Sequence, residues 1–128
     1  MRAADAVAAA VAAAADALFV SSLGSATSAL RLGSADGPHL YLGGAMGCGL
    51  ATALGVAECC PERSVIGVIG DGDLLMGAGS LWSFSGLAPG NLLALVLDDG
   101  RYSITGGQPV VAPDALRSVV PAFPGLAA

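Results

Sequence analysis

Two short acidic motifs each follow a strongly apolar run of the sequence. The run at 65–69 leads into GDGD at 70–73, and the run at 91–97 leads into DDG at 98–100. A carboxylate at the end of a buried strand costs free energy unless a partner compensates for its lost hydration. Carboxylate oxygens are ligands that Mg²⁺ prefers, and a magnesium ion bound by one or two carboxylates usually keeps phosphate oxygens as further ligands. The residue types therefore indicate a cation and a phosphate at this place.

The spacing of the two motifs predicts that their acids meet. Asp99 follows Asp71 by 28 positions, which leaves room for a crossover helix and a second parallel strand. Parallel neighbours would end on the same edge of a sheet, and a divalent cation would offset the repulsion between the two carboxylates. Gly70 and Gly72 would let backbone amides approach a phosphate at the start of a helix. An acidic pocket of the receiver type, or a solvated loop, is the alternative.

The elements that must position these residues alternate between helix and strand. The predicted strands are continuously apolar, which is typical of a parallel sheet covered by helices on both faces, the α/β class. In such sheets ligands bind beyond the carboxyl ends of the strands. The length of 128 residues fits a single domain, residues 1–128. We expect helices at 3–16, 47–60, 74–87 and briefly after Pro113, strands at 17–22, 40–44, 64–70 and 91–99, and a Gly/Ser-rich loop with about one helical turn at 23–39.

Composition narrows the possible functions. The five cationic side chains are all arginine, so a Schiff-base lysine and a P-loop lysine are both excluded. The net charge of −5 argues against nucleic acid as a partner. Hydrophobic residues make up 55% of the chain and charged residues 12%, which predicts extensive contact with other subunits. No apolar run reaches the roughly 20 residues that span a bilayer, so we expect no membrane partner and a cytoplasmic location. Cys48, Cys59 and Cys60 lack metal-ligand spacing, and we expect them to be reduced, buried thiols.

Four segments together resemble the diphosphate-binding module of thiamine-diphosphate-dependent enzymes. They are LFVSSLGSATSAL at 18–30, YLGGAMGCGLATALGVA at 41–57, the GDG with its paired acids, and TGGQ at 105–108. The last segment is most similar to phosphonopyruvate decarboxylase and to the beta subunit of sulfopyruvate decarboxylase. The resemblance covers roughly residues 3 to 110, and it implies the three-layer thiamine-diphosphate-binding fold.

The resemblance assigns metal and diphosphate contacts to particular residues. It implies that the side chains of Asp71 and Asp99 and the backbone carbonyl of Arg101 are ligands of Mg²⁺. It also implies that Gly72 and Asp73 lie against the diphosphate of the cofactor. On the other side of the diphosphate it places the backbone amides around Ile104, Thr105 and Gly106.

For the pyrimidine half of the cofactor, the resemblance implies that this chain supplies only part of the contacts. Gly44, Ala45 and Met46 would lie against the cofactor, with the Gly44 carbonyl accepting from its amino group and Met46 as the wedge that bends it. The glutamate that activates the cofactor comes from a separate pyrimidine-binding domain in this family. Glu58 and Glu62 are placed at the far end of a helix, so we expect that glutamate from a partner chain.

The expected function is a subunit of a Mg²⁺- and thiamine-diphosphate-dependent lyase that decarboxylates a small 2-oxo acid within a hetero-oligomer, by resemblance α2β2. A carboligase that forms a carbon–carbon bond is the nearest alternative. A non-catalytic scaffolding subunit is another, because the family usually has asparagine where this chain has Asp99 and a small neutral residue where it has Asp73. Relatives continue further after TGGQ, so we also expect that the domain is short at its C-terminus and that one edge of the sheet is missing or supplied by a partner.

Overall fold

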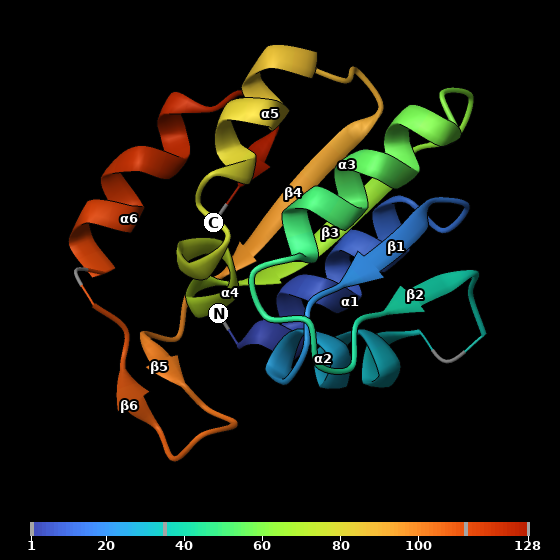
Figure 1. Ribbon diagram of the computed structural model, residues 1–128. Coiled ribbons are helices and arrows are strands. Elements are labelled where there is room, and N and C mark those ends of the chain that lie inside the picture. Colours follow the sequence, from blue (N-terminus) through green and yellow to red (C-terminus); the bar gives the residue numbers. More distant parts are fainter. Residues whose placement is uncertain (1, 35, 112, 128) are drawn as a thin grey trace.

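A five-stranded parallel sheet forms the centre of the protein, in the order β2-β1-β3-β4-β7. The computed structural model describes residues 2–34, 36–111 and 113–127. All strands point toward the same edge, from which a small β5–β6 hairpin projects (Figure 1). The strands are β1 (Leu18–Ser21), β2 (His39–Tyr41), β3 (Val65–Gly70), β4 (Leu92–Leu97) and β7 (Leu126–Ala127), and the hairpin pairs β5 (Arg101–Tyr102) with β6 (Gln108–Pro109).

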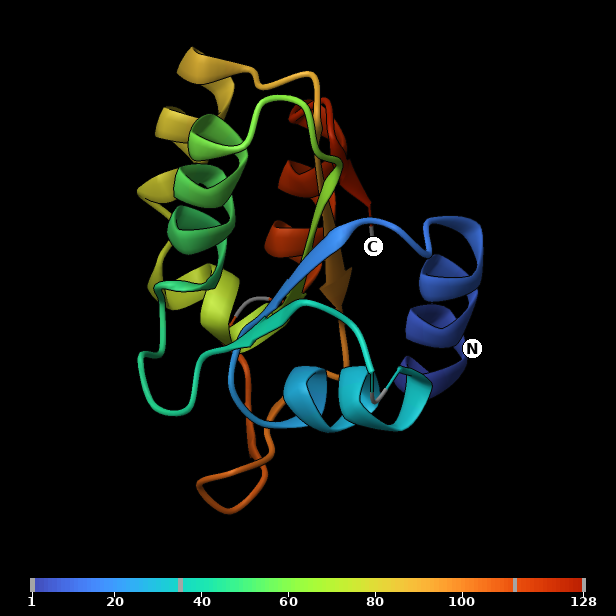
Figure 2. The ribbon, with the colours of Figure 1, turned by 90° about the vertical axis from the view of Figure 1, so that its right-hand side faces the viewer.

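Helices cover both faces of this sheet, as the apolar strands predict (Figure 2). Alternate residues of β3 point to opposite faces, so Val65 and Ile69 join one core cluster while Ile66 and Val68 join the other. The first cluster includes side chains of α3, α5 and α6, and the second includes side chains of α1 and α2. The α/β fold class is therefore confirmed. The helices are α1 (Ala3–Ala13), α2 (Ser25–Gly33), α3 (Gly49–Cys59), α4 (Asp71–Met76), α5 (Ser80–Leu87) and α6 (Pro113–Val119), with a 3₁₀ turn η1 at Val120–Ala122.

The register of β3 against β4 sets the position of the acidic motifs. Gly70, the last residue of β3, is the partner of Leu97, the last residue of β4. The next residues along the chain are Asp71, which begins α4, and Asp98. Both acidic motifs therefore leave the sheet at the same level, because paired parallel strands in register end together.

The segment at 23–39 contains a helix that its composition hides. We expected a loop with about one helical turn, but α2 has nine residues. Ala26, Ala29 and Leu30 form a buried stripe at helical spacing and pack beneath the sheet. Burial of this stripe outweighs the weak helix propensity of the glycine and serine residues around it.

The helix expected at 74–87 is two helices, with a break at 77–79. The first begins at Asp71, directly at the end of β3. At the break, Gly77 lies against Gly47, and a Cβ on Gly77 would collide with the Gly47 carbonyl. The close approach of these two backbones explains why glycine is present where the helix ends.

Three further expectations are corrected. An edge strand is not missing, because β7 pairs with β4 through Ala94–Leu126 and Leu95–Ala127. The strand expected at 40–44 ends at Tyr41, before its two glycines. The cysteines are free but not buried, since Cys48 and Cys59 are exposed and Cys60 is partly so. Among the described residues, no helix has both the length and the apolar character needed to cross a membrane.

The C-terminal end of α3 is closed by a side chain from the start of β4. The Asn91 amide nitrogen Nδ2 donates to the carbonyls of Ala57 (3.1 Å), Cys60 (3.1 Å) and Arg63 (2.9 Å). The last carbonyls of a helix have no partner within the helix, so Asn91 supplies a donor that α3 lacks. The helix is thereby tied to the end of the sheet opposite the acidic motifs.

Asn91→Ala should lower the free energy of unfolding by about 1–3 kcal/mol, because it leaves these carbonyls without their donor. Urea denaturation followed by circular dichroism would measure the change. The control is Ser118→Ala, which removes an exposed hydroxyl that donates to the carbonyl of Ala115 and should change stability by less than about 0.5 kcal/mol. Equal stability of wild type and Asn91→Ala would contradict the capping role.

Candidate cofactor site at the strand ends

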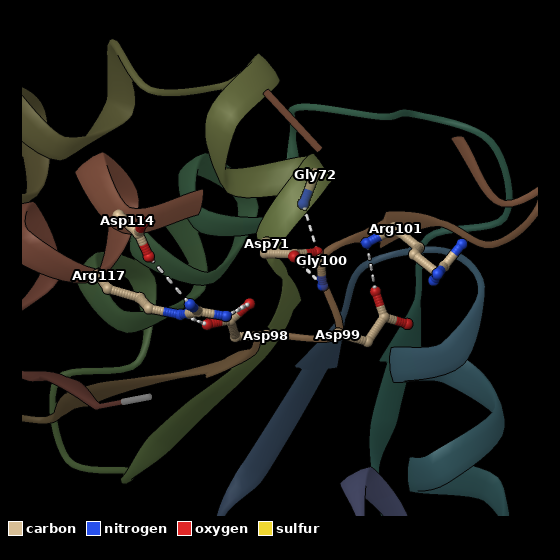
Figure 3. Close-up of polar contacts among 8 residues, drawn as sticks. All are labelled: Asp71, Gly72, Asp98, Asp99, Gly100, Arg101, Asp114 and Arg117. Carbon is tan, nitrogen blue, oxygen red and sulfur yellow. Dashed lines mark hydrogen bonds and ion pairs between the residues drawn. The ribbon is translucent and has the colours of Figure 1, made fainter. Parts of the chain in front are cut away.

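The Asp71 carboxylate joins the two acidic motifs (Figure 3). Its Oδ1 accepts a hydrogen bond from the Gly72 amide, and its Oδ2 accepts one from the Gly100 amide, both at 2.8 Å. The side chain is buried, with 3% of the residue exposed. The structure therefore brings the end of β3 into direct contact with the turn that follows β4, as the spacing predicts.

The ionised form of the Asp71 carboxyl group is disfavoured despite these two hydrogen bonds. Burial raises the pKa of the Asp71 carboxyl above its usual range, the Gly100 and Gly72 amides partly oppose this, and the charges of Asp99 and Asp98 raise it further. Loss of hydration is the largest of these effects. A cation bound at this place would reverse the balance, because it favours the ionised carboxylate.

The two adjacent acids after β4 have different partners. Asp99 is exposed, and its oxygens accept from the Arg101 amide (2.9 Å) and the Ser103 hydroxyl (3.0 Å). Asp98 instead forms an ion pair with Arg117, which also pairs with Asp114 on α6 (Figure 3). Asp99 is thus the member of the pair that is held at the hairpin, while Asp98 ties the end of β4 to α6.

A small cavity of about 90 Å³ lies between these segments. Of the residues predicted to contact the cofactor or metal or to let backbone amides approach the phosphate, it is lined by Met46, Gly70, Asp71, Gly72, Asp73, Asp99, Arg101, Ile104 and Thr105. Gly44 and Ala45 are exposed in the loop before α3, and neither they nor Gly106 line it. The sequence analysis missed five other lining residues, namely Leu23, Gly24, Ser25, Tyr102 and Ser103.

Leu23 to Ser25 could have been identified from the sequence. They follow β1 directly, and the carboxyl ends of parallel strands are where ligands bind in such sheets. At Gly24, φ is +79°, and a Cβ would come within 2.7 Å of the Ile104 side chain. The end of β1 and the hairpin loop therefore pack closely at one side of the cavity.

On another side of the cavity, Gly72 is packed so closely that a side chain has no room. A Cβ on Gly72 would lie 2.6 Å from the Tyr102 ring and 3.5 Å from the Met46 methyl group. Tyr102 and Met46 thus approach the start of α4 from two different segments. The glycine after Asp71 is required by this packing.

The TGGQ segment forms the turn of the β5–β6 hairpin. The amides of Thr105 and Gly107 both donate to the Tyr102 carbonyl, at 3.2 and 3.0 Å, and the Thr105 hydroxyl donates to the Gln108 side chain at 3.0 Å. One of the three amides predicted to meet a diphosphate, that of Thr105, is therefore already paired within the turn.

Asp73 lines the cavity, but its carboxylate oxygens bind elsewhere. Oδ1 accepts from the Gly47 amide at 2.8 Å and Oδ2 from the Gly49 amide at 3.2 Å. Burial raises the pKa of Asp73, and the two amides oppose that rise. The residue lies at the cavity, but its charge is directed at the loop that carries Met46.

The two glutamates lie away from this edge of the sheet. Glu58 is near the C-terminal end of α3, whereas the start of that helix contacts Asp73, and Glu62 is exposed in the following turn. Within the described residues, no group of three or more His, Cys, Asp or Glu side chains is arranged to hold a metal. The site offers two carboxylates and backbone groups.

Comparison with known proteins agrees with this geometry. Residues 22–123 match the family described as thiamine pyrophosphate enzyme, C-terminal TPP binding domain. The chain is 45% identical over 93 residues to a phosphonopyruvate decarboxylase of Streptomyces viridochromogenes, covering 73% of this chain and 23% of that protein. It is 40% identical over 74 residues to sulfopyruvate decarboxylase subunit beta of Methanothermobacter thermautotrophicus, covering 57% of this chain and 40% of the subunit.

A solved structure shares the fold. A chain of 2-oxoglutarate:ferredoxin oxidoreductase from Magnetococcus marinus superimposes with a TM-score of 0.61 at 22% identity, over 84% of this chain and 36% of that one. In each comparison the chain spans less than half the length of the protein it matches. The family match covers most of the chain and includes the Asp71, Asp99 and TGGQ segments, so the chain belongs to the thiamine pyrophosphate enzymes, as their C-terminal TPP binding domain.

Proposed function

We propose that the chain binds the diphosphate of thiamine diphosphate through Mg²⁺, and that with a partner chain it forms a decarboxylase of a small 2-oxo acid. One observation carries the proposal. The Asp71 carboxylate bridges the two acidic motifs beside a cavity lined by both of them. Relatives named phosphonopyruvate and sulfopyruvate decarboxylases support the reaction class.

The oxygen ligands at this edge of the sheet suit a magnesium ion. Mg²⁺ is commonly held by one or two carboxylates together with phosphate oxygens, so a cluster of three acidic side chains is not required. Asp71 and Asp99 would supply the carboxylates, and the Arg101 backbone carbonyl a third ligand. The raised pKa of Asp71 supports this role, because a bound cation would stabilise the ionised form that burial disfavours.

The hydrogen bonds of Asp99 are compatible with a metal ligand at this position. Both of its oxygens already accept a hydrogen bond, one from the Arg101 amide and one from the Ser103 hydroxyl. Each of these oxygens retains lone pairs that could bind a metal. The extra charge, compared with an asparagine, is therefore held in a defined place beside the cavity.

The cavity is too small for the whole cofactor. Small-molecule pockets usually enclose about 300–1,000 Å³, whereas this one holds about 90 Å³. That size suits the phosphate end alone, with Met46 and the exposed Gly44 and Ala45 left to meet the remainder between two chains. The partner would supply a pyrimidine-binding domain and the activating glutamate, in an assembly that we propose to be α2β2.

When bound, the thiazolium ring of the cofactor acts as the electron sink for decarboxylation. The residues of this chain would bind and orient the diphosphate, and Met46 would exclude water from one side of the cavity. Substrates with a second anionic group, such as those in the names of the relatives, are the first candidates.

Asp71→Ala should abolish binding of thiamine diphosphate in the presence of Mg²⁺, because it removes a proposed metal ligand, while leaving the fold largely intact. Calorimetry on the chain mixed with its partner would measure the affinity, and an aldehyde assay would measure decarboxylation. Asp98→Asn is the matched control, since its carboxylate pairs with Arg117. It should retain affinity within about threefold, whereas Asp99→Ala should lose about 100-fold.

Wild-type affinity in Asp71→Ala would refute the metal assignment, and no cofactor binding by the wild-type complex would refute the proposed function. A carbon–carbon coupled product in place of an aldehyde would assign a carboligase.

The raised pKa of Asp71 should also make the stability of the chain depend on pH. Because the pKa of Asp71 is raised in the fold, the folded chain binds more protons than the unfolded chain between the two pKa values. Stability of the cofactor-free chain should therefore fall as pH rises from about 4 through the raised pKa. Binding of Mg²⁺ requires the ionised carboxylate, so stabilisation by Mg²⁺ and thiamine diphosphate should increase over the same interval.

Urea unfolding at a series of pH values, with and without both ligands, would measure these opposite slopes. Asp71→Asn should reduce the slope of the cofactor-free chain to the part that the raised pKa of Asp73 contributes, and it should remove the ligand-dependent gain. Parallel pH profiles with and without ligands would contradict the proposed coupling.

A further inference from the structure

Asp73 is a buried acid that the proposed metal site does not use. The residue is 5% exposed, and its two oxygens bind the amides of Gly47 and Gly49, which are 26 and 24 positions away in the chain. Within the described residues, no ion pair involves Asp73. The structural question is why a buried carboxylate is directed at two glycine amides.

The two bonded amides lie at the N-terminus of α3, on either side of its N-cap residue. The first amides of a helix have no partner within the helix, and a side chain of the preceding residue usually accepts from them. Here the preceding residue is Cys48, whose side chain makes no capping hydrogen bond. Asp73 fills this place from α4, and its negative charge also suits the positive end of the α3 dipole.

The same two bonds fix the segment that carries Met46. They hold the residues on either side of Cys48, and at the first of these, Gly47, φ is +89°. The Met46 methyl group reaches the neighbourhood of Gly72, beside the cavity. A movement of the start of α3 would therefore also move Met46.

We propose that Asp73 is a positioning residue, which caps α3 from α4 and so holds Met46 against the cavity. Its effect on the cofactor rests on the proposed function, but its effect on the Met46 segment does not. The carboxylate supplies one acceptor oxygen to each amide, with Oδ1 bound to Gly47 and Oδ2 to Gly49. The charge of Asp73 thus has a role in the fold that its place beside the cavity does not by itself explain.

Asp73→Asn is the variant that tests this role, because it keeps the shape of the side chain and removes one of its two acceptors. In the cofactor-free chain, the Gly47 or Gly49 amide that loses its acceptor should exchange with solvent about tenfold faster, as expected for loss of one helix cap. The methyl resonance of Met46 should also shift. The sequence contains only three methionines, so a methyl-labelled spectrum assigns this signal readily.

Asn91→Ala is the matched control, because it removes the cap at the other end of the same helix. It should lower global stability while leaving the Gly47 and Gly49 exchange rates and the Met46 resonance unchanged. In the complex with the partner, Asp73→Asn should weaken thiamine diphosphate binding about tenfold and Asn91→Ala less than about twofold.

The wild-type protein provides a test that does not depend on folding of the variant. Its Gly47 and Gly49 amides should exchange at least about tenfold more slowly than those of the exposed Gly43 and Gly44. Equal rates in the wild type would overturn the proposal. An unmoved Met46 resonance in Asp73→Asn, or an equal response in Asn91→Ala, would also overturn it. If the wild-type complex binds no thiamine diphosphate, the proposed function fails while the exchange data still decide the role of Asp73.

Discussion

The dehydration of Asp71 is the constraint on which this edge of the molecule depends. Two parallel strands that end in register force a carboxylate into a place with little water, and such a group is costly unless polar partners surround it. The Gly72 and Gly100 amides supply two partners, one from α4 and one from the turn after β4. The shape of the α4 start and of the β4–β5 connection follows from the need to deliver those amides.

The four acidic side chains at this edge of the sheet have different partners, and two of them are proposed metal ligands. Asp98 binds an arginine of α6, and Asp73 binds the amides of Gly47 and Gly49 at the start of α3. Asp71 and Asp99 are bound to amides and a hydroxyl, none of which carries a positive charge. Of the four acids, only Asp98 is paired with an arginine, and Asp71 and Asp99, which face the cavity, carry charges that a bound cation would compensate.

Much of this arrangement could be predicted from residue order, and the failures have physical causes. The continuous apolar runs predicted the parallel sheet. The interval between Asp71 and Asp99 predicted that the segments after the two strands meet, and the observed contact is between Asp71 and the neighbouring Gly100 amide. By contrast, α2 was hidden by the glycine and serine residues of the segment at 23–39, which favour a loop, although Ala26, Ala29 and Leu30 recur at helical spacing. The break before Ser80 depends on a contact between Gly77 and a distant glycine, and local propensity carries no information about such contacts.

The charge of Asp73 also could not be explained from the sequence. A resemblance places a residue beside a ligand, but it says nothing of where the side-chain oxygens are directed. Only the fold brings the residue to amides more than 20 positions away. Local sequence rules for helix caps consider residues next to the helix, so they do not detect a cap that comes from another element.

Both caps of α3 come from later parts of the chain, and this has a consequence for folding order. Asp73 lies 24 positions after Gly49, and Asn91 lies 31 positions after Cys60. Short helices without tertiary support are marginal in water, so α3 can be fully formed only after β3 and the start of β4 are in place. The order of assembly is therefore non-local, and such topologies fold slowly compared with helical bundles. During synthesis on the ribosome, the segment that carries Met46 would reach its final conformation only after Asp73 has been added to the chain.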